Sequence, residues 1–239
     1  MVKTILRDIP VGCHRLNGPV LALVAGLGMT AGNHGPANAH PHVFIEANLE
    51  IVRDSAGNAT DIRHVWRFDE IFSSSLILDY DDNGSGALDP EELAIIARET
   101  KTSLAEYNFF TEIKQGEEIV EFEAPEPYLV DMDSGQLVMI MSLKLRQPAP
   151  MGKDGFKVAV SDPTYYVAVE MRGESPFEQN AVEVSGNGAG CTSKIIVPDF
   201  DALYAKDAKR LAELFDAGPD DEVEASDEYL TWVHFSCVN

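Results

Sequence analysis

The sequence predicts an α+β fold, in which a mainly antiparallel β-sandwich or barrel-like core carries an inserted EF-hand-like helix-loop-helix and one C-terminal helix. Many short segments alternate apolar and polar residues between turn residues, which is typical of strands. An acidic loop lies between two helix-like segments at about residues 69–107, and apolar residues recur at helical spacing over 201–215. Because no internal repeat or Gly/Ser linker divides the chain, we expect residues 40–239 to form a single domain.

Residues 1–39 have the three parts of a secretory signal peptide. Residues 3–15 carry three basic side chains, residues 19–31 are apolar and uncharged, and Ala37-Asn38-Ala39 is a small-x-small cleavage site. The apolar run of about 13 residues is shorter than the roughly 20 that a membrane-spanning helix needs. We therefore expect an exported, periplasmic protein that begins at His40 and inserts no segment into the membrane. An uncleaved membrane anchor is the alternative.

The first two strands are expected at residues 42–52 and 60–68, joined as a hairpin by the turn-rich segment 54–58. If Val52 pairs with about Asp61, Leu49 lies level with His64. His64 alternates with apolar residues on one strand face and is expected to be a hydrogen-bonded core histidine. After the helical insertion, two more hairpins turn at residues 115–116 and 134–135. Further strands are expected at 156–160, 165–171, 182–185, 192–197 and 229–237.

Residues 81–92, with the sequence DDNGSGALDPEE, match the calcium-binding loop of an EF-hand position by position. Gly86 stands at position 6, where such a loop turns sharply, and Leu88 at position 8 is the apolar anchor against the helices. The alternative is an acidic surface turn that binds no ion. The ligands expected at positions 1, 3, 5, 7, 9 and 12 are Asp81, Asn83, Ser85, the carbonyl of Ala87, Asp89 and Glu92.

A second metal site is predicted at the new N-terminus that leader cleavage would create. The α-amino group and the imidazoles of His40 and His42 are three nitrogen donors, and they suit zinc, nickel, cobalt or copper. The first-hairpin register places His42 level with about Glu70 or Ile71, so Asp69 and Glu70 are the carboxylates within reach. An ordinary frayed N-terminus that happens to carry histidines is an equal alternative.

The cysteines predict one disulfide. Cys13 would leave with the leader, so Cys191 and Cys237 remain as an even pair in an oxidising compartment. Both lie in strand-like segments, so the bridge would join the last strand to an earlier one. Two free buried thiols are the alternative.

The net charge limits the partners that the protein can have. The whole chain carries −22, and removal of a leader with three basic residues and one acid leaves −24. Such a surface repels nucleic acid and anionic membranes, which argues against both as partners. The acidic run 220–228 is expected to be a solvated loop.

Taken together, several segments in this order resemble the DUF1007 family. They are a leader that ends before HPHVFIE, the segment IRHVWRFDEIFS, the acidic loop, LAEYNFF and DPTYY at residues 162–166. The resemblance implies a periplasmic protein of Gram-negative bacteria that serves as the accessory component of a transition-metal transport system of the nickel/cobalt permease type. It implies no established catalytic residue. It favours His40 and His42 as ligands and marks Asp162 and Tyr165 as a functional or structural corner, although Asp-Pro-Thr is also typical of a turn.

Three functions are compatible with these features. The first, which we expect, is a non-enzymatic, exported calcium-binding accessory protein that delivers or buffers a transition metal for a membrane metal permease. The second is a structural β-domain that calcium stabilises, with no transport role. The third is an oxidative enzyme that uses copper at the N-terminal histidine. The sequence contains neither the spacing of a hydrolase triad nor a glycine-rich nucleotide loop.

Overall fold

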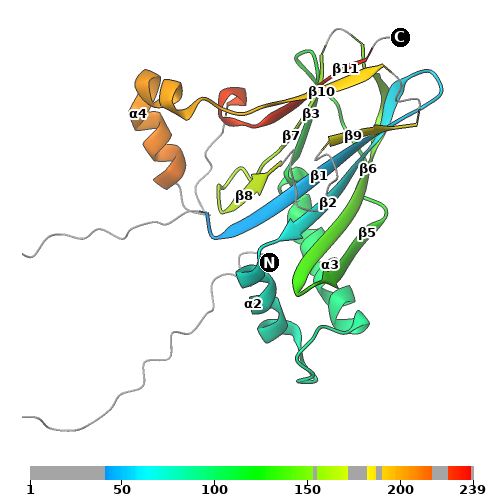
Figure 1. The fold of residues 1–239 in the computed structure, drawn as a ribbon, viewed down its shortest axis with the longest axis vertical. Helices are drawn as coiled ribbons and strands as arrows, with labels where there is room; N and C mark the ends of the chain where they lie inside the picture. Colours follow the sequence, from blue (N-terminus) through cyan, green and yellow to red (C-terminus); the bar gives the residue numbers. More distant parts are fainter. Residues whose placement is uncertain (1–40, 153–154, 172–181, 187–189, 217–225, 238–239) are drawn as a thin grey trace, which may run out of the picture.

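The computed structural model describes residues 41–152, 155–171, 182–186, 190–216 and 226–237. Over these residues the protein has the expected α+β composition, with two β-sheets and three α-helices (Figure 1). The predicted leader, His40 and most of the acidic run 220–228 lie outside the described residues.

The larger sheet has the strand order β5-β6-β2-β1-β8, and β9 also pairs with β1. Strands β5, β6, β2 and β1 are antiparallel, whereas β8 and β9 run parallel to β1 along its two halves. The larger sheet is therefore mixed on the outer side of β1, where the sequence predicted a mainly antiparallel arrangement. The bounds are β1 Val43–Arg53, β2 Asn58–Phe68, β5 Tyr128–Asp133, β6 Gln136–Pro150, β8 Val167–Glu170 and β9 Val182–Ser185.

The first hairpin has the register that the sequence predicts. Val52 pairs with Asp61 and Leu49 pairs with His64. His64 is fully buried, as expected for a core histidine, and its Nε2 lies 3.4 Å from the hydroxyl oxygen of Thr111.

The smaller sheet is antiparallel throughout and has the order β10-β11-β7-β3-β4. Cys191 and Cys237 lie directly opposite each other on β10 and β11, and their sulfur atoms are bonded. The predicted disulfide is therefore confirmed. The bounds are β3 Thr111–Gln115, β4 Glu118–Ile119, β7 Phe156–Val160, β10 Cys191–Ile196 and β11 Trp232–Cys237.

One face of the larger sheet supplies most of the core. Every second residue of β1 is buried, as the alternation of a strand requires, and the intervening side chains point outward. Apolar side chains of the smaller sheet pack on part of this face, and helices α2 and α3 cover the rest (Figure 1). The two sheets and the helix pair therefore share one continuous core.

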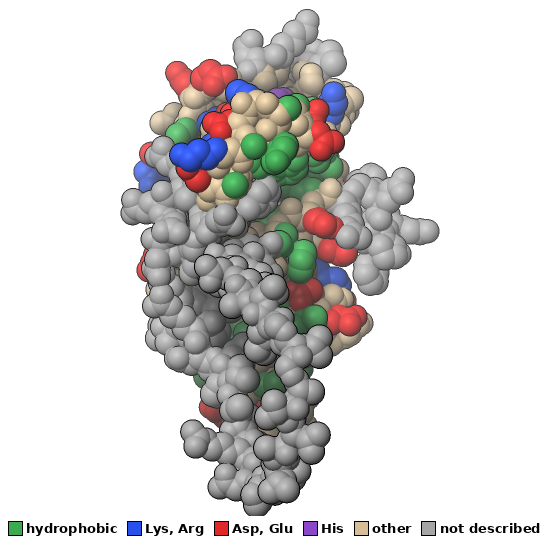
Figure 2. All heavy atoms as spheres, turned by 90° about the vertical axis from the view of Figure 1, so that its left-hand side faces the viewer, with side chains coloured by type: hydrophobic (Ala, Val, Ile, Leu, Met, Phe, Trp, Pro, Cys, Tyr) green, Lys and Arg blue, Asp and Glu red, His purple; other side chains and the backbone are tan. Residues whose placement is uncertain are grey.

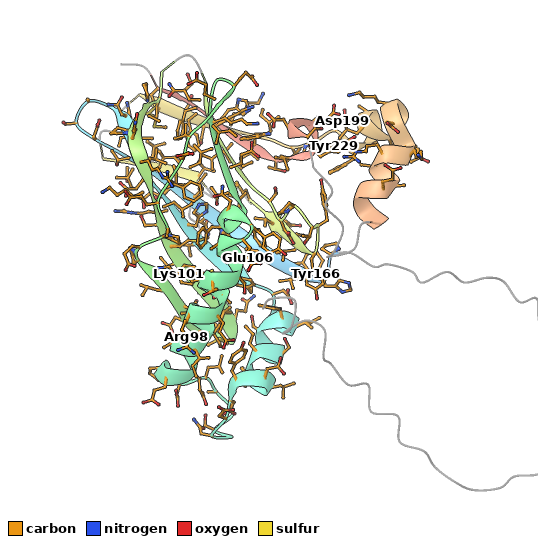
Figure 3. The ribbon with its side chains drawn as sticks, turned by 180° about the vertical axis from the view of Figure 1, so that it is seen from behind. Arg98, Lys101, Glu106, Tyr166, Asp199 and Tyr229 are labelled. Carbon is orange, nitrogen blue, oxygen red and sulfur yellow. A yellow bond between two sulfur atoms is a disulfide. The ribbon has the colours of Figure 1, made fainter. Side chains whose placement is uncertain are left out.

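Helix α2 (Glu70–Tyr80) follows β2 directly, and helix α3 (Pro90–Ala105) follows α2 after a loop. A polar residue caps the start of each helix. Asp69 caps α2, while Asp89 and Glu92 form a capping box at the start of α3. Further along α3, Lys101, which Figure 3 labels, forms an ion pair with Glu126 and lies over the Tyr128 ring of β5. These contacts join α3 to the edge strand of the larger sheet.

Helix α4 (Phe200–Asp216) is the expected C-terminal helix, and it packs on a cluster separate from the main core. It rests on a small cluster in which Leu203 and Leu211 contact Tyr229 and Tyr165. The face drawn in Figure 2 shows acidic, basic and apolar side chains interspersed. Within the part of the chain that the structure describes, no helix is both long and apolar enough to cross a membrane.

Candidate functional site

The loop between α2 and α3 turns at two glycines. Gly84 and Gly86 both adopt positive φ, at 67° and 83°, where a side chain would be strained. Leu88 is buried in the core, as expected for the apolar anchor at position 8. The loop thus turns sharply at position 6 and is fixed to the helices two residues later.

Asp81, at position 1, faces the inside of the loop. Its Oδ1 accepts a hydrogen bond from the Ser85 amide at 2.9 Å, and its Oδ2 accepts one from the Gly86 amide at 2.7 Å. The Gly86 N–H, together with the Ser85 amide, holds the pKa of Asp81 below its ordinary value. The carboxylate is therefore ionised and oriented by the turn.

The other end of the loop is anchored by Glu92, which is only 5% exposed. Its Oε2 accepts from the Asp89 amide at 2.8 Å, and its Oε1 accepts from the Asp82 amide at 3.0 Å. The side-chain amide of Asn83 donates to Asp89 at 3.0 Å and to Glu92 at 3.2 Å. Hydrogen bonds thus link the side chains at positions 3, 9 and 12 of the loop.

The donor chemistry of this loop fits calcium, which prefers oxygen ligands from carboxylates, amides and backbone carbonyls. Ser85 donates to the carbonyl of Ala87 at 2.8 Å, so these two predicted ligands also lie side by side. Among the described residues, no three His, Cys, Asp or Glu side chains are grouped as the ligands of one metal ion. Loop N–H groups and the NH₂ of Asn83 occupy the carboxylates, so a cation must displace those bonds and turn the Asn83 oxygen inward.

The carboxylates predicted for the second metal site lie where β2 passes into α2. Asp69 caps α2 with Oδ1, and its Oδ2 accepts a hydrogen bond from the Phe44 amide at 2.9 Å. Glu70 is exposed beside it. Both residues line a groove of about 440 Å³ that also includes Phe44, Glu46, Arg67, Ile71, Gln136 and Glu170.

His42 lies at the start of β1, two residues before Phe44, and is exposed. Its ring lies 4.9 Å from the ring of Tyr166, and its amide donates to the Tyr166 carbonyl at 2.9 Å. Figure 3 shows Tyr166 beside the N-terminal end of β1. The structure therefore places His42 two residues before Phe44, whose amide binds Asp69.

The segment DPTYY forms a structural corner. Asp162 is buried and accepts hydrogen bonds from Thr164 and from the Val167 amide. Burial raises the pKa of Asp162, against the lowering effect of these bonds. Burial also raises the pKa of Tyr165 to about 12, and this residue supports α4 at positive φ. Both residues thus have contacts that stabilise this corner of the fold.

The sequence did not predict the contact between His42 and Tyr166, or Glu46 and Glu170 in the groove. Both depend on the parallel pairing of β1 with β8, which places Glu46 beside Glu170. A parallel partner more than 100 residues along the chain leaves no local periodic signal. The hydrophobic run at residues 165–171 was the available sign that a strand existed there.

Comparison with known proteins identifies a family and two relatives. A family model described as a protein of unknown function, DUF1007, matches residues 25–237. An uncharacterised protein of Haemophilus influenzae is 26% identical over 165 residues, which cover 68% of this chain and 75% of the relative. An uncharacterised 15.5 kDa protein in the trpE 3′ region of Spirochaeta aurantia is 26% identical over 117 residues, which cover 48% of this chain and 79% of the relative.

Proposed function

This chain belongs to the DUF1007 family, and from that premise we propose that it is an exported, periplasmic calcium-binding accessory protein of a transition-metal transport system. One observation carries the calcium part of the proposal. The residues at the six ligand positions of an EF-hand-like sequence lie in one turn between α2 and α3, where the Asn83 side chain donates hydrogen bonds to Asp89 and Glu92.

Each loop residue has a defined task in this proposal. Asp81, Asp89 and Glu92 supply the charge, Glu92 through both oxygens, while Asn83, Ser85 and the Ala87 carbonyl supply neutral oxygens. Calcium would neutralise the negative charge of these carboxylates, which hydrogen bonds from the N–H groups of the loop otherwise stabilise. With only three ligand carboxylates, the expected dissociation constant is that of extracellular modules, about 10⁻⁴ to 10⁻³ M.

Calorimetric titration of the processed protein with calcium tests this assignment. Glu92→Gln removes the charge of the bidentate ligand and should abolish measurable binding. Glu91→Gln is the matched control, because Glu91 is exposed and makes the same charge change one residue away from the ligand. Equal calcium affinity in wild type and Glu92→Gln would show that the ligand assignment is wrong.

The transport role rests on a second metal site at the mature N-terminus, with zinc, nickel, cobalt or copper as cargo for a membrane metal permease. The supporting observation is the position of His42, which is exposed at the head of β1 and two residues from the amide that binds Asp69. His40 and the freed α-amino group would add two nitrogens, and Asp69 or Glu70 a carboxylate oxygen. Because protons compete for the amine and both imidazoles, affinity should fall steeply below about pH 6.

Zinc and copper titrations of four proteins test this second site. The forms are the protein that begins at His40, the same protein with one extra residue before His40, His42→Ala, and His234→Ala as a control for an exposed histidine elsewhere. We expect weaker binding in the second and third forms only. Equal affinities in all four would leave a calcium-stabilised structural β-domain, and oxygen consumption by the copper-loaded protein would instead favour an oxidative enzyme.

A further inference from the structure

Helix α2 carries apolar side chains on its outer face as well as on its inner face. The inner face is already occupied, because Leu76 is buried in the main core and Phe72 packs against that core. On the outer face, Ile71 and Leu78 are 85% and 87% exposed, the highest values among the exposed large apolar side chains of the described residues. A surface helix normally carries polar side chains on the face that it turns to solvent, so these two positions break the pattern. The outer face of α2 is therefore an unpartnered apolar surface.

The two exposed side chains lie on one stripe, because residues seven apart on a helix are about two turns apart. At about 1.5 Å per residue they are separated by about 10 Å along the helix axis, which is about the width of a second helix. Ser74 and Ser75 lie between them, and their hydroxyls donate to the carbonyls of Glu70 and Phe72 at 2.7 and 2.8 Å. The middle of the stripe thus presents small side chains whose polar groups are already paired. We call the surface formed by residues 71, 74, 75 and 78 the α2 stripe.

Negative charge flanks the α2 stripe. With about 3.6 residues per turn, Glu70 and Asp79 lie on opposite sides of the stripe, and both are exposed. Helix α2 contains no basic residue. Ile71 and Phe44 also line the groove described above, whose lining includes four acidic residues and one basic residue. These charges favour a basic partner and oppose contact between two copies of the stripe.

We propose that the α2 stripe is the docking site of another protein, which contributes an amphipathic helix with apolar residues along one side and Lys or Arg residues beside them. The apolar side chains of that helix pack over Ser74 and Ser75, between Ile71 and Leu78, and its basic residues lie close to Glu70 on one side of the stripe. In this mode of recognition the apolar anchors supply affinity and the flanking charges supply orientation. The proposal does not depend on the calcium or transition-metal sites proposed above.

Three synthetic peptides of about 18 residues, long enough for five helical turns, test the proposal. The first has leucines at helical spacing along one side and lysines elsewhere, the second has glutamate in place of lysine, and the third has the composition of the first in an order that forms no apolar side. Fluorescence anisotropy of each labelled peptide measures its binding to the processed protein, and NMR follows the methyl groups of Ile71 and Leu78. We expect saturable binding of the first peptide with shifts at these methyls, and binding of the other two at least tenfold weaker.

Truncation of the two exposed side chains separates docking on α2 from general attraction between unlike charges. The double variant Ile71→Ala, Leu78→Ala retains the helix, because alanine has the highest helix propensity, and it should weaken the first peptide at least tenfold. The double variant Ile119→Ala, Val197→Ala is the matched control, because it truncates side chains that are 69% and 68% exposed elsewhere, and it should leave the affinity unchanged. Asp79→Asn should weaken binding about threefold and reduce its dependence on salt.

Equal affinity of the first peptide for wild type and for Ile71→Ala, Leu78→Ala would overturn the proposal, because net charge alone would then explain the attraction. Equal binding of the lysine and glutamate peptides would overturn the choice of a basic partner. Two other occupants would give distinct results. A dimer of the processed protein in light scattering that the double variant abolishes would assign the stripe to a second copy, and flotation of wild type but not of the double variant with phosphatidylcholine vesicles would assign it to a lipid surface. Either result would overturn the proposal.

Discussion

At the scale of single residues, the core contains a histidine that folding keeps neutral. His64 is fully buried between apolar neighbours, with one long contact to Thr111 through Nε2. In the described part of the chain its Nδ1 has no hydrogen-bond partner. Burial lowers the pKa of His64 from an ordinary value near 6.5 to about 3.

This lowered pKa predicts acid sensitivity in a defined range. Between about pH 6.5 and pH 3 the unfolded chain binds a proton at His64, whereas the folded protein does not. The free energy of unfolding should therefore fall as pH falls through this window, by at most about 1.4 kcal/mol per pH unit from this residue. Urea unfolding of wild type and His64→Leu at pH 7, 6, 5 and 4 measures the difference in slope.

Carboxylates also titrate in this range, so the comparison between variants isolates the histidine. His42→Ala is the matched control, since it removes an exposed histidine and leaves His64 in place. If His64→Leu lost stability with falling pH as steeply as wild type, the buried imidazole would not be the source of the acid sensitivity.

At the scale of elements, β10 and β11 depend on their disulfide. The bridge joins directly opposed residues, and Arg53 of β1 donates a hydrogen bond to the Cys191 sulfur at 2.8 Å. Arg53 is itself buried. The bridge therefore ties the edge strand β10 to β11 at a point where the smaller sheet also contacts Arg53 of the larger sheet.

Removal of the bridge should destabilise the protein markedly. The cysteines are separated by 46 residues, and closing a loop of that length in the unfolded chain contributes roughly 4 kcal/mol in the chain-entropy model. Urea unfolding of the Cys191→Ser, Cys237→Ser double variant should show a loss of this order. Intact-mass measurement with and without reductant and an alkylating agent checks the bridge directly, and two alkylated thiols in the native protein without reductant would contradict it.

The sequence predicted those elements whose causes are local. The first hairpin register follows from a short turn and from the alternation that buries His64, and both were correct to the residue. The helix pair, the buried Leu88 and the cysteine pair also carried local or compositional signals. The parallel strands β8 and β9 and the groove around Asp69 come from contacts between distant segments, so the hydrophobic periodicity of the sequence could not predict them. Within the loop, the donors could be named but not the orientation of the Asn83 amide.

At the scale of the whole molecule, the larger sheet extends beyond the smaller one, and α2 and α3 close the uncovered end (Figure 1). Acidic residues outnumber basic residues in the chain, and on the face in Figure 2 basic groups lie among the acidic ones. A small cation is therefore attracted by the overall charge, while the fold decides where it can be held.

Helices α2 and α3 are joined to each other beside the loop. The hydroxyl of Tyr80, which immediately precedes Asp81, donates a hydrogen bond to Glu99 of α3 at 2.8 Å, and Glu92 belongs both to the loop and to the first turn of α3. A cation in the loop would therefore act on both helices and, through them, on the face of the larger sheet that they cover. Because the unfolded chain does not hold these segments together, calcium bound in the loop would raise the free energy of unfolding, and stability would rise with calcium concentration.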